Sequence, residues 1–188
     1  MKLINKILWI IIIFLLICLV IKKINLIKYN NENKANIKQY ISFTSSNTLS
    51  SKPEINLYDA VLEVKSLNLK QGIVKYKNSN IDKNVVYLYP EKINNLSSQN
   101  LVIAAHSGNT SLSFFHNLNK LKEDEKVNIY FKGNKYIYEI ISIKEKDKDG
   151  IINIEHQDNS KLYLTTCSEN DESKQLIVIA NLKNVESY

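Results

Sequence analysis

Arginine is absent from this sequence of 188 residues, and all 25 basic residues are lysines. Any mechanism that needs the planar guanidinium fork is therefore excluded. Glycine and proline are scarce, with four and two residues, which excludes collagen-like and Pro/Gly-rich low-complexity chains. The two cysteines are too few for a disulfide-stapled mini-protein or a four-cysteine zinc module. The remaining composition, 44% hydrophobic and 23% charged, is typical of a folded protein with one compact domain.

Charge is divided unevenly along the chain. Residues 1–53 carry eight lysines and one acid, a net charge of +7, whereas residues 54–188 carry 17 lysines and 18 acids, a net charge of −1. The overall charge of +6 therefore belongs to the N-terminal arm. Because a nucleic-acid-binding domain is expected to carry its own basic face, we expect no nucleic-acid partner.

Residues 7–21 contain no charged or amide side chain, and lysines flank this run on both sides. The run is shorter than the ~20 residues that a membrane helix needs, but apolar neighbours extend it and flanking lysines can reach the interface. A cleaved signal peptide would need a small-residue cleavage site, which the following KKINLIKYN lacks. We therefore predict an uncleaved membrane anchor over residues 1–28. A polar, extended stalk is expected over 29–53, with only a weak indication of helix over 31–40.

From residue 54 onward the pattern is typical of β-strands. Gly133-Asn134 predicts a hairpin turn, and apolar side chains at spacings of three and four predict one helix over 111–121. Eight strands with little helix favour an all-β barrel or sandwich. The runs rich in β-branched and aromatic residues lie at 61–64, 73–76, 85–89, 101–105, 126–131, 136–143, 161–166 and 176–182.

Two residues of reactive types end apolar runs. His106 follows LVIAA and Cys167 follows LYLTT, and a polar segment comes after each. A strand end can fix such a side chain while the loop leaves it open to substrate, and a thiol needs a base or imidazolium partner to become a nucleophile. The alternative is an inert buried cysteine and a polar strand cap. The histidine precedes the cysteine in this sequence, which argues against papain-like proteases, in which the cysteine comes first. His116, on the predicted helix, and His156, in a polar loop, are expected to be solvated.

The segments around these two residues resemble the sortases. LVIAAH at 101–106, with the following SGNTSLSFFHNLNKLKEDEKVNIYF, is similar to the sortase histidine region, and KLYLTTC at 161–167 resembles the T-L-x-T-C strand. The upstream YDAVLEVKSLNLKQGIV resembles the opening strand pair. The likeness covers roughly residues 54–182, which would form the catalytic domain within 54–188. It implies an all-β fold, a closed eight-stranded β-barrel with one or two short helices, preceded by an N-terminal transmembrane helix.

The resemblance also implies thiol-mediated transpeptidation. Cys167 would attack the Thr–Gly bond of an LPxTG-like sorting signal at the C-terminus of a secreted protein, and an amine of a peptidoglycan precursor or a pilin would resolve the thioester. His106 would be the general acid and base, and Thr166 would lie against the bound signal. No cofactor is implied. The domain would be extracellular on a single-pass anchor in the cell membrane. The alternatives are a catalytically weak surface-tethered barrel that binds cell-wall peptides and a hydrolytic cysteine peptidase.

One departure from the family pattern concerns the arginine that sortases place at the start of the last strand, facing the cysteine. Aligning LIVIA at 176–180 with that strand puts Gln175 at this position, beside Lys174. Either Gln175 supplies hydrogen bonds to the substrate, or Lys174 binds it from a shifted register, or activity is impaired. We favour Gln175, because strand alternation turns Lys174 to the opposite face.

The segment 144–160, KEKDKDGIINIEHQDNS, corresponds to the sortase loop that shapes signal specificity. It has no obvious helical insert, which resembles class A more than class B. The sequence contains no H-x-x-H or C-x-x-C motif, so zinc has little support. We predict no metal site, since no EF-hand pattern is formed by the acids Glu145, Asp147, Asp149, Glu155 and Asp158.

Overall fold

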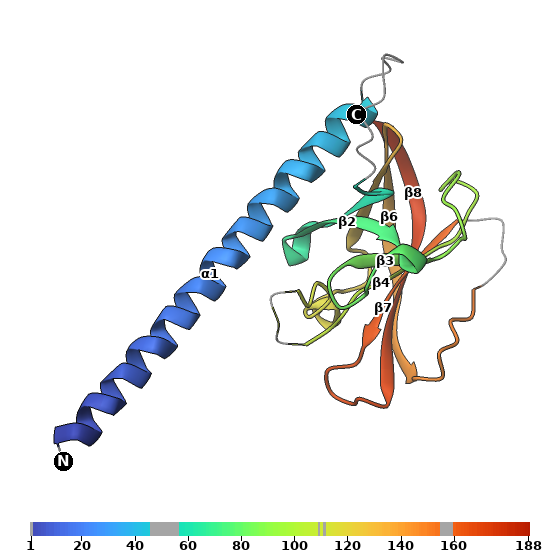
Figure 1. Ribbon diagram of the computed structural model, residues 1–188. Helices are drawn as coiled ribbons and strands as arrows, with labels where there is room; N and C mark the ends of the chain where they lie inside the picture. The colour runs from blue at the N-terminus through green and yellow to red at the C-terminus, as the bar shows by residue number, and fades with distance from the viewer. Residues whose placement is uncertain (1, 46–56, 109, 111, 155–159) are drawn as a thin grey trace. The chain divides into compact units, whose positions relative to one another are not determined.

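The computed structural model describes residues 2–45, 57–108, 110, 112–154 and 160–188. The chain divides into two compact units, Met1–Asn36 and Ile37–Tyr188. One long helix contributes residues to both units, and all strands belong to the second (Figure 1).

The helix α1 (Lys2–Ser45) contains the predicted anchor and continues through much of the predicted stalk. It includes one segment that is long and apolar enough to cross a membrane. The prediction of an extended stalk is wrong for residues 29–45. This segment has no glycine or proline to end the helix, and Lys28 and Glu32 lie 3.9 Å apart at the favourable i,i+4 spacing. Residues 46–53 of the predicted stalk lie outside the described residues.

The last turns of α1 pack within the second unit. Ile37 is buried, and the Tyr40 hydroxyl donates a hydrogen bond to the backbone carbonyl of Asp59 at 3.0 Å. The hydroxyls of Thr44 and Tyr188 lie 2.6 Å apart. The compact unit that holds the strands therefore begins before residue 54.

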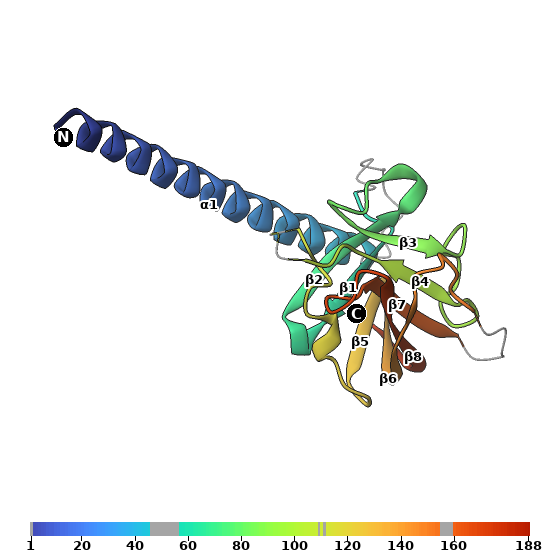
Figure 2. The ribbon, with the colours of Figure 1, turned by 90° about the horizontal axis from the view of Figure 1, so that it is seen from below.

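Eight strands close into a barrel in the order β1-β2-β3-β4-β7-β8-β6-β5 (Figure 2), which confirms the predicted fold. The pairs β2–β3 and β4–β7 are parallel, and the other neighbours are antiparallel. The strands are β1 (Ala60–Val64), β2 (Leu69–Lys75), β3 (Val85–Tyr89), β4 (Leu101–Ala104), β5 (Lys126–Phe131), β6 (Asn134–Asp147), β7 (Lys161–Cys167) and β8 (Lys174–Ser187).

Alternating side chains of these strands form an inner and an outer face. The inner face is the main hydrophobic core, which includes the fully buried Tyr138 and Leu62. A smaller apolar cluster lies on the outer face of β4, β7 and β8, and two residues of the β6–β7 connection pack against it. We call this set the outer cluster. Its members are Val102, Tyr163, Ile177 and Ile179, with Ile152 and Ile154 from the connection.

The hairpin between β5 and β6 turns one residue earlier than the sequence predicts. Phe131 pairs with Asn134, so the turn residues are Lys132 and Gly133. Both have positive φ, 46° and 77°, as the two-residue turn of a twisted hairpin requires. A Cβ on Gly133 would also lie 2.7 Å from the Thr44 carbonyl oxygen, so glycine fits this position for two reasons.

The helix predicted over 111–121 is not an α-helix. The described part of this segment is a series of turns that ends in the 3₁₀ helix η3 (Leu118–Lys120). Its backbone N–H groups mostly bond three residues back, and that of Phe115 donates instead to the His106 carbonyl at 3.2 Å. Phe115, Leu118 and Leu121 of the apolar stripe are still buried and Phe114 is partly buried, because a spacing of three suits a 3₁₀ turn as well. Two more 3₁₀ helices, η1 (Lys65–Leu67) and η2 (Tyr76–Asn78), flank β2.

Candidate active site

The parallel pair β4 and β7 brings both reactive residue types to the same end of adjacent strands. Ala104 lies opposite Thr165 in this register. Cys167 is the last residue of β7, and His106 follows the end of β4 by two residues. Just before His106, the backbone N–H of Ala105 donates to the Thr165 carbonyl at 3.4 Å. The Ser107 hydroxyl spans the two chain segments and donates a hydrogen bond to the Cys167 carbonyl at 3.0 Å. The two strand ends are therefore neighbours.

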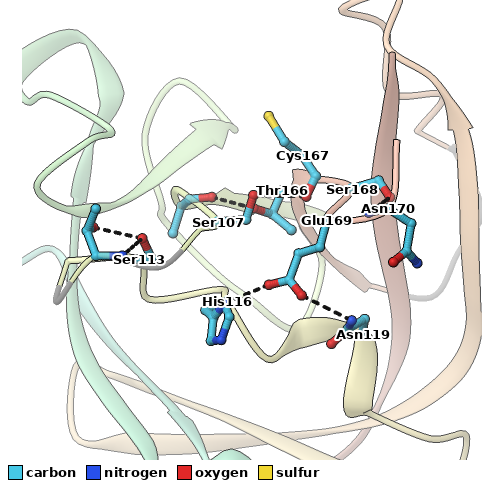
Figure 3. A network of polar contacts seen from close by, with 11 residues as sticks. Ser107, Ser113, His116, Asn119, Thr166, Cys167, Ser168, Glu169 and Asn170 are labelled. Carbon is cyan, nitrogen blue, oxygen red and sulfur yellow. Dashed lines mark hydrogen bonds and ion pairs between the residues drawn. The ribbon is translucent and has the colours of Figure 1, made fainter. Parts of the chain in front are cut away.

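Strand alternation turns the Cys167 side chain to the outer face. Cys167 follows Tyr163, a member of the outer cluster, by four residues within β7, whereas His106 lies beyond the end of β4. Cys167 and His106 are both half-buried. Figure 3 shows the Cys167 thiol pointing away from the side chains of Thr166 and Glu169. The thiol therefore lies on the outer face, and His106 lies at the same end of the β4–β7 pair.

Gly108 shapes the space beside the imidazole. Its φ of +121° turns the chain directly after the histidine segment, in a region that favours glycine. A Cβ built on Gly108 would lie 3.5 Å from Nε2 of His106. Gly108 also lines a cavity of about 290 Å³. Its lining includes Leu67, Leu69, Gly108, Ser113, Phe114 and His116.

Thr166 faces away from the thiol that follows it. Its side chain is buried, and its hydroxyl donates a hydrogen bond to the carbonyl of Ala105 at 2.9 Å. The bond joins β7 to the segment that carries His106. In this structure Thr166 therefore holds the two strand ends together and does not line the outer face.

The two candidates for the missing arginine point in different directions. Gln175 pairs with Cys167 across β7 and β8, so both side chains share the outer face. Its side-chain amide Nε2 donates to the Ile151 carbonyl at 3.3 Å. Lys174 has the opposite parity, and its ammonium lies 3.9 Å from the Asp171 carboxylate. The register therefore places Gln175, and not Lys174, beside the cysteine.

The sequence reasoning missed Lys146 of β6. Lys146 pairs with Gln175 from the other side, so it shares the outer face with Cys167. Its ammonium donates to the Ile151 carbonyl at 2.8 Å and lies 3.0 Å from a carboxylate oxygen of Asp149. The backbone N–H of Ile151 and this ammonium hold the pKa of Asp149 below its ordinary value. The sequence at 144–147 sets Lys144 and Lys146 on one face of a strand. It shows that this is the face of Cys167 only once the register of β6 against β8 is known.

Polar side chains hold the start of the connection between β7 and β8. Glu169 lies between Nδ1 of His116, 2.7 Å away, and the Asn119 amide, which donates to it at 3.4 Å (Figure 3). Ser168 donates from its hydroxyl to the Glu145 carboxylate at 2.6 Å. The expectation that His116 is solvated is therefore wrong in part, since the ring is 41% exposed but contacts Glu169. His156 lies outside the described residues.

Among the described residues, no group of three His, Cys, Asp or Glu side chains is arranged to hold a metal ion. Two of the acids named above, Glu155 and Asp158, lie outside that part of the chain.

Comparison with known proteins decides the family. The sortase domain model matches residues 62–183, which span β1 to β8 and both reactive residues. This chain belongs to the sortase family. No curated protein matches it significantly.

Solved sortases share the fold at low sequence identity. Sortase A from Listeria monocytogenes is 17% identical with a TM-score of 0.60, over 71% of this chain and 92% of that one. A sortase D5 transpeptidase from Clostridium perfringens is 17% identical with a TM-score of 0.62, over 81% and 98%. Sortase C from Clostridium perfringens, solved with the C-terminal cell wall sorting motif, is 21% identical with a TM-score of 0.56, over 80% and 86%. These sortases carry different class names, so the similarity supports the family and does not single out class A.

Proposed function

We propose that this sortase is a membrane-anchored cysteine transpeptidase that cleaves an LPxTG-like sorting signal and joins the carried protein to an amine. The observation that supports this most is the β4–β7 register, together with the bond from Ser107 to the Cys167 carbonyl. These contacts join the chain segments that carry His106 and Cys167, which supports the pairing of a thiol with a base that nucleophilic catalysis requires.

The first half of the reaction forms a thioester. The Cys167 thiolate attacks the carbonyl carbon between Thr and Gly of the signal, a C–S bond forms, and the carbonyl electron pair moves to oxygen. When the intermediate collapses, the C–N bond breaks and the His106 imidazolium gives its proton to the leaving glycine amine. The N-terminal part of the signal remains on the cysteine.

The second half transfers the acyl group. The nitrogen of the incoming amine attacks the thioester carbon, and the neutral imidazole of His106 takes a proton from that amine. The C–S bond then breaks, an amide forms, and the Cys167 thiolate is restored. The acceptor would be an amine of a peptidoglycan precursor or a pilin.

Two further residues support these steps. Gln175 shares a face with Cys167, and its amide can donate a hydrogen bond to the oxygen on which charge develops. Thr166 serves as a positioning residue, because its bond to the Ala105 carbonyl fixes the two catalytic strand ends relative to each other. Lys174 has no direct role in this proposal, since its ammonium pairs with Asp171.

The N-terminal helix gives the location of the reaction. Its apolar segment is exposed in the structure and long enough to span a bilayer, and lysines flank it. These features support the proposal that the protein is anchored in the cell membrane, with the barrel outside as the sortase family implies. Secreted proteins with C-terminal sorting signals would be its substrates.

The test uses the full-length chain in detergent micelles with internally quenched peptides that contain Leu-Pro-x-Thr-Gly, with and without triglycine as acceptor. We expect cleavage, with transfer to triglycine. C167A should abolish cleavage, and H106A should lower turnover ~10²–10⁴-fold. C18A is the matched control, since Cys18 lies in α1, and it should leave turnover unchanged. Cleavage without transfer would indicate a hydrolytic peptidase, and peptide binding without cleavage would indicate a binding barrel.

A further inference from the structure

The arginine that sortases place beside the cysteine is absent from this chain. A neutral Gln175 can donate hydrogen bonds but cannot offset a full negative charge on an oxyanion. We propose that Lys146 and Gln175 together form the binding pair for the reacting carbonyl oxygen, with Lys146 as the cationic member. This inference rests on the proposed transpeptidase activity.

The strand register sets the two donors in one row with the nucleophile. Cys167 of β7 pairs with Gln175 of β8, and Gln175 pairs with Lys146 of β6. Laterally paired residues project from the same face of a sheet. Lys146 is two strand spacings, about 10 Å, from Cys167 at the backbone. A carbonyl group bound between them would be within reach of the long lysine side chain.

The two donors already converge on one carbonyl oxygen. The Lys146 ammonium donates to the Ile151 carbonyl at 2.8 Å and the Gln175 amide donates to the same oxygen at 3.3 Å. An extended peptide offers the same chemical group. The Ile151 carbonyl therefore stands in for a substrate carbonyl and marks where the two donors can hold one.

Replacement of the Ile151 carbonyl by a substrate carbonyl costs little free energy. Each donor keeps a hydrogen bond when the substrate oxygen replaces that of Ile151, so no buried donor loses its partner. Ile151 as a whole residue is 57% exposed, so its released carbonyl can bond to water. Asp149, whose side chain is 45% exposed, balances the Lys146 charge until substrate arrives.

The charge matters most when the thiolate attacks. The carbonyl electron pair then moves to oxygen, and a hydrogen bond from an ammonium to this oxygen is stronger than one from an amide. No proton needs to move to or from Lys146. When the C–N bond breaks, the C=O bond re-forms and the donors return to a neutral carbonyl. An interaction that strengthens in this way raises kcat more than it lowers KM.

Five variants of the full-length chain in detergent test the proposal, with the quenched Leu-Pro-x-Thr-Gly peptides as probe. K146M should lower kcat ~10²-fold, as removal of one oxyanion donor does, with a small change in KM. K146R, which keeps the charge, should retain most of the activity. K146M combined with Q175R should recover activity, because the guanidinium then supplies the charge. K144M is the matched control on the same face of β6, opposite Ile177, and should match the wild type.

D149N separates catalysis from anchoring of the loop. The asparagine can still accept the Ile151 N–H, but its side chain no longer pairs with the Lys146 charge. Turnover at or above the wild-type level is expected if Lys146 acts on the substrate. A loss in D149N as large as that in K146M, or a K146M variant as fast as the wild type, would overturn the inference alone. A wild-type protein that cleaves no peptide would overturn the proposed function and this inference with it.

Discussion

Substitution of Thr166 by valine tests whether this residue holds the two catalytic strand ends together. Valine keeps the shape of the side chain and removes the hydroxyl that donates to the Ala105 carbonyl at 2.9 Å. Both residues are buried, so water has little access to the carbonyl that loses this donor. Leaving a buried polar group without its partner costs ~1–3 kcal/mol. We therefore expect the free energy of unfolding to fall by this amount, which is about a 5- to 150-fold change in the unfolding equilibrium.

The assay is urea-induced unfolding of the full-length chain in detergent, followed by circular dichroism of the strands, together with peptide cleavage. T166S should restore most of the stability, because it keeps the hydroxyl. S66A is the control, since the bond from Ser66 to Glu125 is exposed, and it should change stability by less than about 0.5 kcal/mol. An unchanged free energy of unfolding in T166V, combined with a raised KM, would refute the reasoning and return Thr166 to a substrate-binding role.

Two further predictions concern the barrel and the helix. Glu63 accepts three side-chain hydrogen bonds, including that of the Lys70 ammonium at 3.0 Å. Burial raises the pKa of Glu63, but these donors outweigh it and the net pKa is lowered from 4.5. The ionised Glu63 should therefore stabilise the fold above pH 4.5, and this stabilisation should disappear as the pH falls through the lower pKa of the folded state. Measured by urea unfolding, the free energies of unfolding of E63Q and of the wild type should converge at acid pH. A difference that stays constant with pH would contradict this. Removal of residues 1–28 should release a folded protein from the membrane pellet. Removal of residues 1–53 should also lower the melting temperature, because the contacts of Tyr40 are lost. Equal melting temperatures for the two truncated proteins would contradict the packing of the end of α1.

The barrel is predictable from sequence where strands bury one face. All eight strands appear as β-branched and aromatic runs for this reason. The ends of β6 and β8 are missed because they pair with each other at the surface, where ion pairs such as Lys135–Glu186 replace the apolar pattern. The polar part of α1 is missed for a similar reason, since a helix with a weak apolar stripe gives no periodic signal. The segment before η3 is misassigned because the spacing of three within its apolar pattern suits α and 3₁₀ turns alike.

The site is predictable only in part. His106 and Cys167 stand out because each ends an apolar run, and alternation correctly separates Gln175 from Lys174. Lys146 could not be found in this way. Its position opposite Gln175 depends on a register shift between Ile140 and Ser142 of β6, and the sequence has no local signal for that irregularity. The contact between His116 and Glu169 joins residues far apart in the chain, and so depends on the closed barrel itself.

The most direct test of the central claim is the detection of the acyl-enzyme. The full-length chain would be mixed with a Leu-Pro-x-Thr-Gly peptide without acceptor, quenched in acid, and measured by intact mass and by mapping of proteolytic fragments. The account predicts a mass increase equal to the peptide up to its threonine, on the fragment that contains Cys167, and its removal when triglycine is added. Cleavage of the peptide with no adduct, or an adduct that persists in C167A, would contradict it.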